Sequence, residues 1–242
     1  MEDISMNKTE FWFPGRWIGG TSMIVAPILM LVSQVLLVKF DFFYPYQLKA
    51  YYDHPNLLIT AYSLYLAGNI LLWPAAATIA RYVGQKEPML GLVGGTLVMF
   101  GLFARTFHYG INHMAFQLVN VQNLQSATKA IGDSYGAFHV VSTLSAAIMF
   151  GWIILAMGTY RSGMLNLIQS ICLGLMSGLM LGVLKGASPF SIICSIGLLI
   201  AMLALGKKVL TDGQKPSTKN LVFWPLAIIV IITAMYLFGQ AG

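Results

Sequence analysis

The chain has 242 residues, of which 57% are hydrophobic and only 9% are charged, and its mean hydropathy is +0.75. A soluble domain usually carries about 25% charged residues, so this composition excludes a soluble globular protein and indicates a polytopic membrane protein. The net charge of +6 is not gathered into a basic soluble segment with interleaved aromatic residues, so nucleic acid is not an expected partner.

Seven apolar stretches are long enough to cross a membrane, for which about 20 mostly apolar residues are needed. We predict an all-α protein with a single transmembrane domain over residues 1–242, built as one bundle of seven helices. The predicted spans are 17–38, 57–82, 89–119, 134–159, 164–184, 188–206 and 221–239. The first span is longer than the apolar core of a signal peptide and is therefore expected to be retained.

Lysine and arginine are unevenly distributed between the two sides of this predicted bundle. Nine lie at the N-terminus or in the connections after even-numbered spans, and four lie in the connections after odd-numbered spans. Since positive charge in short loops stays cytoplasmic, we expect the N-terminus inside and the C-terminus outside. The expected location is the cell membrane, with the lipid bilayer around a multi-pass protein.

The second predicted span combines polar and aromatic residues with a helix-breaking residue. Pro74 removes one backbone donor and frees the carbonyl of Ile70. Tyr65 and Asn69 lie along one face close to this site, which indicates a face turned toward protein or water rather than lipid. The alternative is that Asn69 makes a hydrogen bond that only joins two helices.

The third predicted span contains the polar stretch "FARTFHYGINH", residues 103–113, inside an apolar run. At about 100° per residue, six residues of this span share an arc of about 140° on one helix face: Arg105, His108, Tyr109, Asn112, His113 and Phe116. A polar stripe on an apolar helix faces the bundle interior or a wet cavity, because charge in hydrocarbon costs several kcal/mol.

Depth can be estimated from the helical rise of about 1.5 Å per residue. Counted from an outer end near Val119, His113 lies about 9 Å below the boundary and Arg105 lies near the middle of the bilayer. His139 on the next span is nearly level with His113. No acidic residue lies within the core of a predicted span, so Arg105 needs a carbonyl, an outer aspartate such as Asp133, or a ligand as its partner.

These features predict an outward-opening pocket built by the second, third and fourth spans and the 39–56 connection. The expected ligand is a small anionic or amphipathic molecule, or a lipid-like one, and the expected role is transport, sensing or immunity. Whether the protein is an enzyme stays open. The predicted ligand-binding residues are Arg105, His108, Tyr109, Asn112, His113, His139, Asn69 and Tyr65.

Two alternatives use the histidines as ligands of a cofactor. In a haem-binding redox protein, His113 and His139 would be the axial ligands of one haem. In a metal-dependent membrane hydrolase, His108, His113 and His139 would hold zinc or another transition metal. The second alternative is weaker, because the two histidines of one span lie about 140° apart and no intramembrane carboxylate is available as a general base.

The fifth predicted span carries glycines at four-residue spacing, which on one helix would form a continuous groove. Small residues let another helix backbone approach closely. The groove indicates either packing within the bundle or a contact with an oligomer or a partner helix. Its glycines are Gly174, Gly178, Gly182 and Gly186, and Gly91 and Gly95 repeat the spacing in the third span.

Overall fold

The computed structural model describes residues 12–136, 140–179, 181–212 and 217–241, and every regular element in these ranges is a helix. Six helical segments there are long and apolar enough to cross a membrane. They are Arg16–Leu37, Pro55–Gly84, Pro88–Val121, Val140–Arg161, Pro189–Thr211 and Val222–Gly239. The prediction of an all-α, multi-pass membrane protein is confirmed, but the described residues contain six long helices rather than seven.

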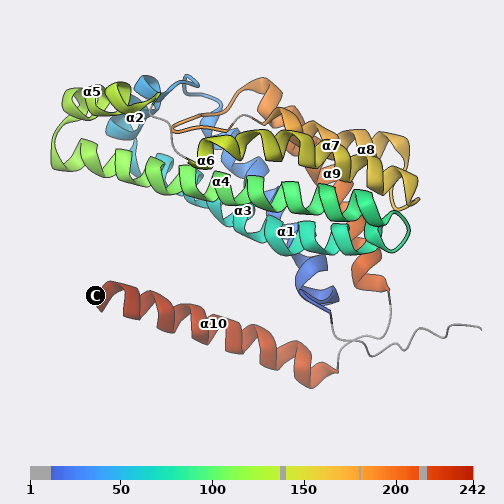
Figure 1. The fold of residues 1–242 in the computed structure, drawn as a ribbon. Coiled ribbons are helices and arrows are strands. Elements are labelled where there is room, and N and C mark those ends of the chain that lie inside the picture. Colours follow the sequence, from blue (N-terminus) through green and yellow to red (C-terminus); the bar gives the residue numbers. More distant parts are fainter. Residues whose placement is uncertain (1–11, 137–139, 180, 213–216, 242) are drawn as a thin grey trace, which may run out of the picture. The chain divides into compact units, whose positions relative to one another are not determined.

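The helices follow one another in the order shown in Figure 1. They are α1 (Arg16–Leu37), α2 (Tyr44–Asp53), α3 (Pro55–Gly84), α4 (Pro88–Val121), α5 (Leu124–Ser134), α6 (Val140–Thr143), α7 (Ser145–Arg161), α8 (Leu167–Gly174), the short 3₁₀ helix η1 (Leu175–Gly178), α9 (Pro189–Thr211) and α10 (Thr218–Ala241). Residues up to Leu210 form one compact unit, and Thr211–Gly242, which contains α10, forms a second.

Local sequence explains where several helices begin. The helices α2, α3 and α4 each have a proline in their first turn, where the missing N–H costs nothing because it would be unpaired anyway. At the start of α8, the Asn166 side chain accepts from the N–H of Gln169, and the Gln169 side chain accepts from the N–H of Asn166. This reciprocal cap satisfies two backbone donors and fixes the first turn.

The first unit is held together by close helix pairs, in which α1 packs on α3, α3 on α4, and α4 on α7. Glycines make the close approach possible. Gly91 and Gly95 of α4 face Ala80 and Gly84 of α3, so the small residues predicted in the third span serve packing inside the bundle.

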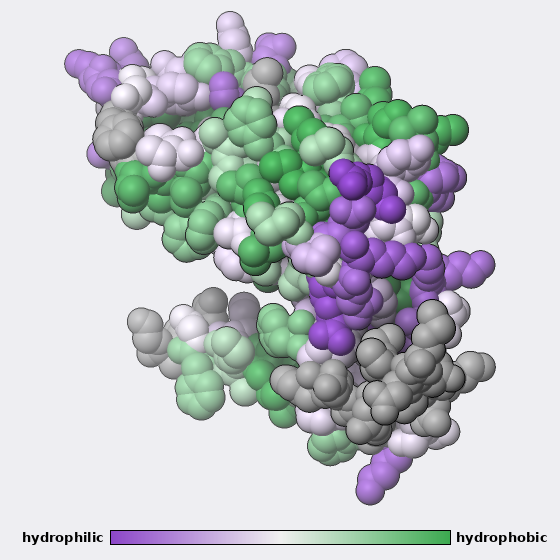
Figure 2. Space-filling view, turned by 45° about the vertical axis from the view of Figure 1, so that its right-hand side comes forward, coloured by the Kyte–Doolittle hydropathy of each residue, from purple (hydrophilic) through white to green (hydrophobic). Residues whose placement is uncertain are grey.

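Two of these helices are longer than a bilayer needs. The 30 residues of α3 and the 34 residues of α4 correspond to about 45 and 51 Å, against a hydrocarbon core of about 30 Å. Where α4 ends, the shorter helices α2 and α5 pack against it and present exposed charges such as Lys49 and Lys129. Both short helices lie in segments that the sequence predicts to be connections between spans. Figure 2 shows apolar side chains across the middle of the first unit and hydrophilic ones gathered toward its ends.

The opposite end of the bundle is also charged. Nε of Arg161, at the end of α7, lies 3.2 Å from a carboxylate oxygen of Glu87 in the α3–α4 connection. Nζ of Lys86 donates to the carbonyl of Ser162 at 2.9 Å. These contacts tie two helix connections together and mark an end of the bundle that faces water.

The predicted fourth span, 134–159, differs from the structure at its start. Ser134 is the last residue of α5, Tyr135 and Gly136 lie in a turn, and the next described helices are α6 and α7. His139 lies outside the described residues.

The prediction of one continuous helix over 164–184 is wrong. The helical part of this segment ends at Gly178, and the described residues that follow, as far as Ser188, are not helical. Gly182 has φ 152, a backbone conformation that glycine alone adopts easily, and Gly186 is buried against the Gln47 side chain. The glycines at four-residue spacing therefore do not form one helical groove, and a partner helix at this segment stays a prediction.

Candidate functional site

After Gly178 the described residues as far as Ser188 are not helical, and this stretch is called the interrupted segment below. A cavity of about 310 Å³ lies where it passes α4. Its walls come from α1, the α1–α2 connection, α3, α4, described residues between Gly178 and Ser188, and the start of α9. Five of the predicted ligand-binding residues line it: Arg105, His108, Tyr109, Asn112 and Tyr65. The polar face of α4 and the tyrosine face of α3 therefore meet, as the helical spacing predicted.

Arg105 is the central charged group of this cavity and is only 2% exposed. Its Nη2 donates to the carbonyl of Leu179 at 3.2 Å, and its guanidinium carbon lies 5.8 Å from the centre of the Tyr65 ring. Its Nη1 is buried and has no hydrogen-bond partner in the described part of the chain. A buried guanidinium with an unpaired N–H group carries a desolvation cost that a bound anion would offset.

The cavity has a positive lining. None of its described lining residues is Asp or Glu, whereas Arg105 and Lys185 both line it. The ion pairs Lys49–Asp53 and Arg161–Glu87 lie elsewhere. Asp133, which the sequence offered as a partner for Arg105, is exposed on α5. Arg105 instead donates to the carbonyl of Leu179, which is free because the helix ends at Gly178.

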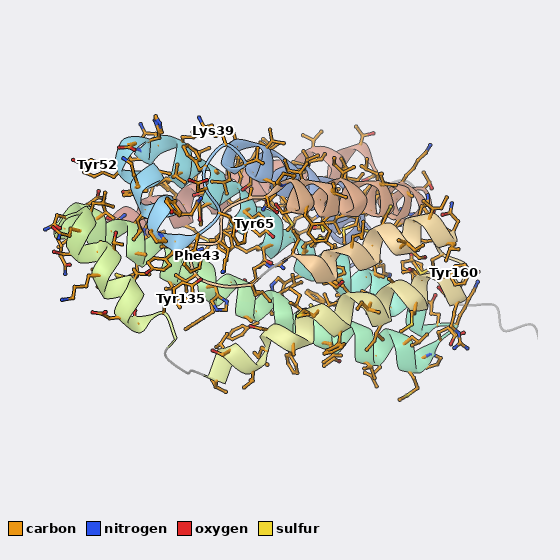
Figure 3. All side chains as sticks on the ribbon, turned by 90° about the horizontal axis from the view of Figure 1, so that it is seen from above. Lys39, Phe43, Tyr52, Tyr65, Tyr135 and Tyr160 are labelled. Atoms are coloured by element: carbon orange, nitrogen blue, oxygen red, sulfur yellow. The ribbon has the colours of Figure 1, made fainter. Side chains whose placement is uncertain are left out.

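Lys185 is the second cation, and aromatic rings hold its stem and ammonium group. Its Nζ lies 4.8 Å from the ring centre of Phe43, 5.4 Å from that of Phe42 and 5.7 Å from that of Tyr135. Phe43 and Tyr135 are themselves in edge contact, and both can be found beside each other in Figure 3. Cation–π contacts of this kind hold the half-buried ammonium group in place.

The interrupted segment is held open by side chains of α4 and α3. The N–H of Leu184 donates to Oδ1 of Asn112 at 2.6 Å. Leu184 has φ 50, an uncommon backbone conformation for a residue other than glycine. The Tyr62 hydroxyl donates to Oε1 of Gln47 at 3.0 Å, and Gly186, next to the mouth of the cavity, packs on the same Gln47 side chain. Non-helical backbone inside a membrane protein needs such partners, because lipid supplies none.

Replacing Asn112 with alanine is expected to lower the free energy of unfolding by about 1–3 kcal/mol, because the buried N–H of Leu184 loses its acceptor. Thermal unfolding of the purified variant measures this loss. The matched control is Asn120→Ala on the same helix, an exposed residue whose amide bonds the Tyr51 hydroxyl. If the two variants unfold at the same temperature, Asn112 does not hold the segment.

Tyr65, Tyr109 and His108 complete the wall beside Arg105. The Tyr65 and Tyr109 rings stack with their centres 5.1 Å apart and their planes 4° from parallel. Nδ1 of His108 lies 2.8 Å from the carbonyl of Ala104, and because a carbonyl only accepts, this nitrogen carries a proton. The two aromatic rings offer an apolar surface beside Arg105.

Two other predicted residues lie outside the cavity. Asn69 is buried and donates to the carbonyl of Leu102 at 3.2 Å and to the Thr106 hydroxyl at 2.9 Å. This is the helix-joining role that the sequence left as its alternative. His113 is exposed on α4, at the edge of the predicted arc, and does not line the cavity.

The cofactor alternatives depend on His139, which the structure does not describe. Among the described residues, no group of three His, Cys, Asp or Glu side chains is close enough to hold a metal ion. His108 is buried and His113 is exposed, so the two histidines of α4 point to different surroundings. The haem pair and the three-histidine site stay predictions.

Several cavity residues were not predicted from the sequence. Gln34 of α1 lines the cavity and accepts a hydrogen bond from the Ser191 hydroxyl at 2.6 Å. Lys185 lies between the predicted fifth and sixth spans. Two sequence features could have indicated these residues: a glutamine inside the first apolar span, and the combination of glycines, a lysine and Pro189 within "GVLKGASP".

Comparison of the chain with known protein families, curated proteins and solved structures gives no match, so the site rests on its own geometry.

Proposed function

We propose that the protein binds a small anionic or amphipathic ligand in the cavity between α4 and the interrupted segment. The observation that carries this proposal is Arg105, which is buried and has one guanidinium nitrogen without a partner in the described residues. Arginine presents a planar fork of donors that matches carboxylate and phosphate groups. An anion beside Nη1 would pair the charge and fill the donor positions that Leu179 leaves open.

The size and lining of the cavity support a small ligand. Ligand sites usually enclose about 300–1,000 Å³, and about 310 Å³ is near the lower limit. The stacked rings of Tyr65 and Tyr109 offer an apolar wall, while Lys185 stands at the side formed by the α1–α2 connection. A ligand with one anionic group and an apolar body fits both features.

The interrupted segment supports a role in translocation or sensing rather than static storage. Transporters often bind their substrates where membrane helices are discontinuous, because the freed backbone groups and flexible joints are available there. Here the break after Gly178 is held by Arg105 and Asn112, which also line the cavity. A ligand that competes with Leu179 for Arg105 would alter the contacts that hold this segment.

The proposal includes a topology. If the segment from Leu167 to Ser188 crosses the membrane in addition to the six long helices, the chain crosses seven times. The excess of lysine and arginine at the N-terminus and after even-numbered spans then favours a cytoplasmic N-terminus and an outside C-terminus. A reporter enzyme fused after residue 242 is expected to read as outside, and a cytoplasmic reading would contradict this topology.

The depth of Arg105 follows from the charged end of the bundle at Glu87 and Arg161. Arg105 lies seventeen residues after Pro88, or about 26 Å along α4. Against a hydrocarbon thickness of about 30 Å, this is close to the opposite boundary. The cavity would then be shallower than the sequence suggested and would open beside α2 and α5 on the outer side.

Binding of benzoate tests the function directly. Benzoate has one carboxylate and one flat ring, which match the cations and the tyrosine wall. Equilibrium dialysis with the protein in lipid nanodiscs should give saturable binding to the native chain and strongly weakened binding to Arg105→Gln. Equal binding to both would show that the cavity is not the site.

A further inference from the structure

A second cavity lies beside the first and has a different chemical character. It is an apolar groove of about 390 Å³ between α7, α8, η1 and the first turn of α9. No charged residue is found among its described lining residues, which include Ile153, Met157, Tyr160 and Ile171. These four side chains are exposed, so the groove opens to the surroundings of the bundle.

The groove and the Arg105 cavity share a wall. Gly178 and Phe190 line both of them. Gly178 has no side chain, and a Cβ placed on it would lie 2.7 Å from Cε1 of the Phe190 ring. The ring of Phe190, which is half exposed, therefore stands against bare backbone and forms the partition. Rotation of one exposed aromatic side chain is fast, so this partition can move.

The length and direction of the groove match a hydrocarbon chain. Its α8–η1 wall runs from Leu167 to Gly178, about 17 Å at the helical rise. It ends near Tyr160, which lies toward the end of the bundle opposite Tyr52 in Figure 3. A molecule with its charged group at Arg105 would thus extend its chain away from the α2–α5 end and along α7 and α8.

The geometry points to an anionic lipid with a single acyl chain as the ligand, its headgroup at Arg105 and its chain in the α7–α8 groove. This inference rests on the proposed anion site and names its ligand class. The headgroup then lies near the outer boundary and the chain runs inward from it, which is the orientation of a lipid of the outer leaflet. Entry past Phe190 would let the ligand come from the bilayer without crossing water.

Photo-crosslinking tests the position of the chain. The probe is laurate with a diazirine at the end of its chain, added to the native protein in nanodiscs, and mass spectrometry maps the labelled peptides. Labelling is expected on α7 and α8, between Ile153 and Ile171, and is expected to fall by about tenfold or more in Arg105→Gln, because the carboxylate loses its cation. Labelling of these helices that is unchanged in Arg105→Gln would be ordinary lipid contact and would overturn the inference.

A variant that fills the groove separates chain binding from headgroup binding. In Gly174→Leu the added side chain enters the groove, since a Cβ there meets only Ala156 at 3.5 Å. Labelling should fall about tenfold, because overfilling such a space typically costs about 1–3 kcal/mol, while benzoate binding stays normal. Gly110→Leu is the matched control, since a Cβ at Gly110 meets nothing within 4 Å and Gly110 lines neither cavity.

The outcomes distinguish the two proposals. If benzoate binding depends on Arg105 but the laurate probe labels other helices, the anion site stands and the acyl-chain inference fails. If benzoate does not bind to the native protein, the proposed function itself fails. Should Gly174→Leu not fold, as judged by lost benzoate binding, Ile171→Trp fills the same groove from an exposed position on α8 and gives the same comparison.

Discussion

Arg105→Gln is expected to weaken benzoate binding by about 100-fold. Removing one partner of a buried, hydrogen-bonded charge pair typically costs about 2–5 kcal/mol, and 100-fold corresponds to about 2.7 kcal/mol. Glutamine keeps an amide near Leu179 but has no positive charge. Arg105→Lys should give an intermediate affinity, because lysine retains the charge without the planar fork of donors. Equilibrium dialysis of the three proteins measures this order.

The stability of the same variant separates a binding role from a structural one. A buried charge without an ionic partner usually destabilises a fold, so Arg105→Gln should unfold at the same temperature as the native protein or a higher one. If Arg105 served only to hold the Leu179 carbonyl, the variant would unfold earlier. Arg161→Gln, at the charged end of α7, removes an exposed arginine paired with Glu87 and should leave benzoate binding unchanged.

Gly151→Ala should lower the free energy of unfolding by about 1–3 kcal/mol, the usual cost of overpacking a close contact. Gly151 lies where α7 meets α4, and a Cβ on it would lie 2.6 Å from the backbone nitrogen of Val98 and 2.9 Å from the carbonyl carbon of Leu97. Backbone atoms cannot move aside as a flexible side chain can, so the helices must separate. Thermal unfolding in detergent measures the effect.

The control for this substitution is Gly110→Ala on α4, where a Cβ meets nothing within 4 Å. A glycine inside a helix costs about 0.5–1 kcal/mol relative to alanine, so this variant should be as stable as the native protein or more so. The two changes are chemically identical and differ only in what faces the added methyl group. Equal unfolding temperatures would mean that α4 and α7 are not packed as closely as described.

Much of the site could be predicted from the helical period of the third span. A polar face on an apolar helix must lie against protein or a water-filled cavity, because charge in hydrocarbon is costly. The polar residues of this stretch within about 60° of Arg105 on the wheel, namely His108, Tyr109 and Asn112, do line the cavity. His113, at about 80°, is exposed instead. The predicted arc was too wide at that edge, since the cavity accepts only the side chains that face α3 and the interrupted segment.

The break in the fifth span could not be predicted from its own residues, which are apolar over a full membrane thickness. Hydropathy treats such a run as one helix, because a helix satisfies its backbone without help. The chain instead leaves the helix after Gly178, and its freed groups find Arg105 and Asn112 on α4, more than seventy positions away in the sequence. These hydrogen bonds are tertiary contacts between distant parts of the sequence. Without knowing them, neither Leu179 nor Lys185 can be assigned to the site.

The most direct measurement of the anion site is an anomalous difference map from crystals grown with para-bromobenzoate. The bromine atom marks the ring, and the carboxylate must lie within a ring length of it. The predicted result is one strong peak inside the cavity, against the Tyr65 and Tyr109 rings and with the carboxylate toward Nη1 of Arg105. Crystals in which the only peaks lie outside this cavity would contradict the proposal that Arg105 holds an anionic ligand.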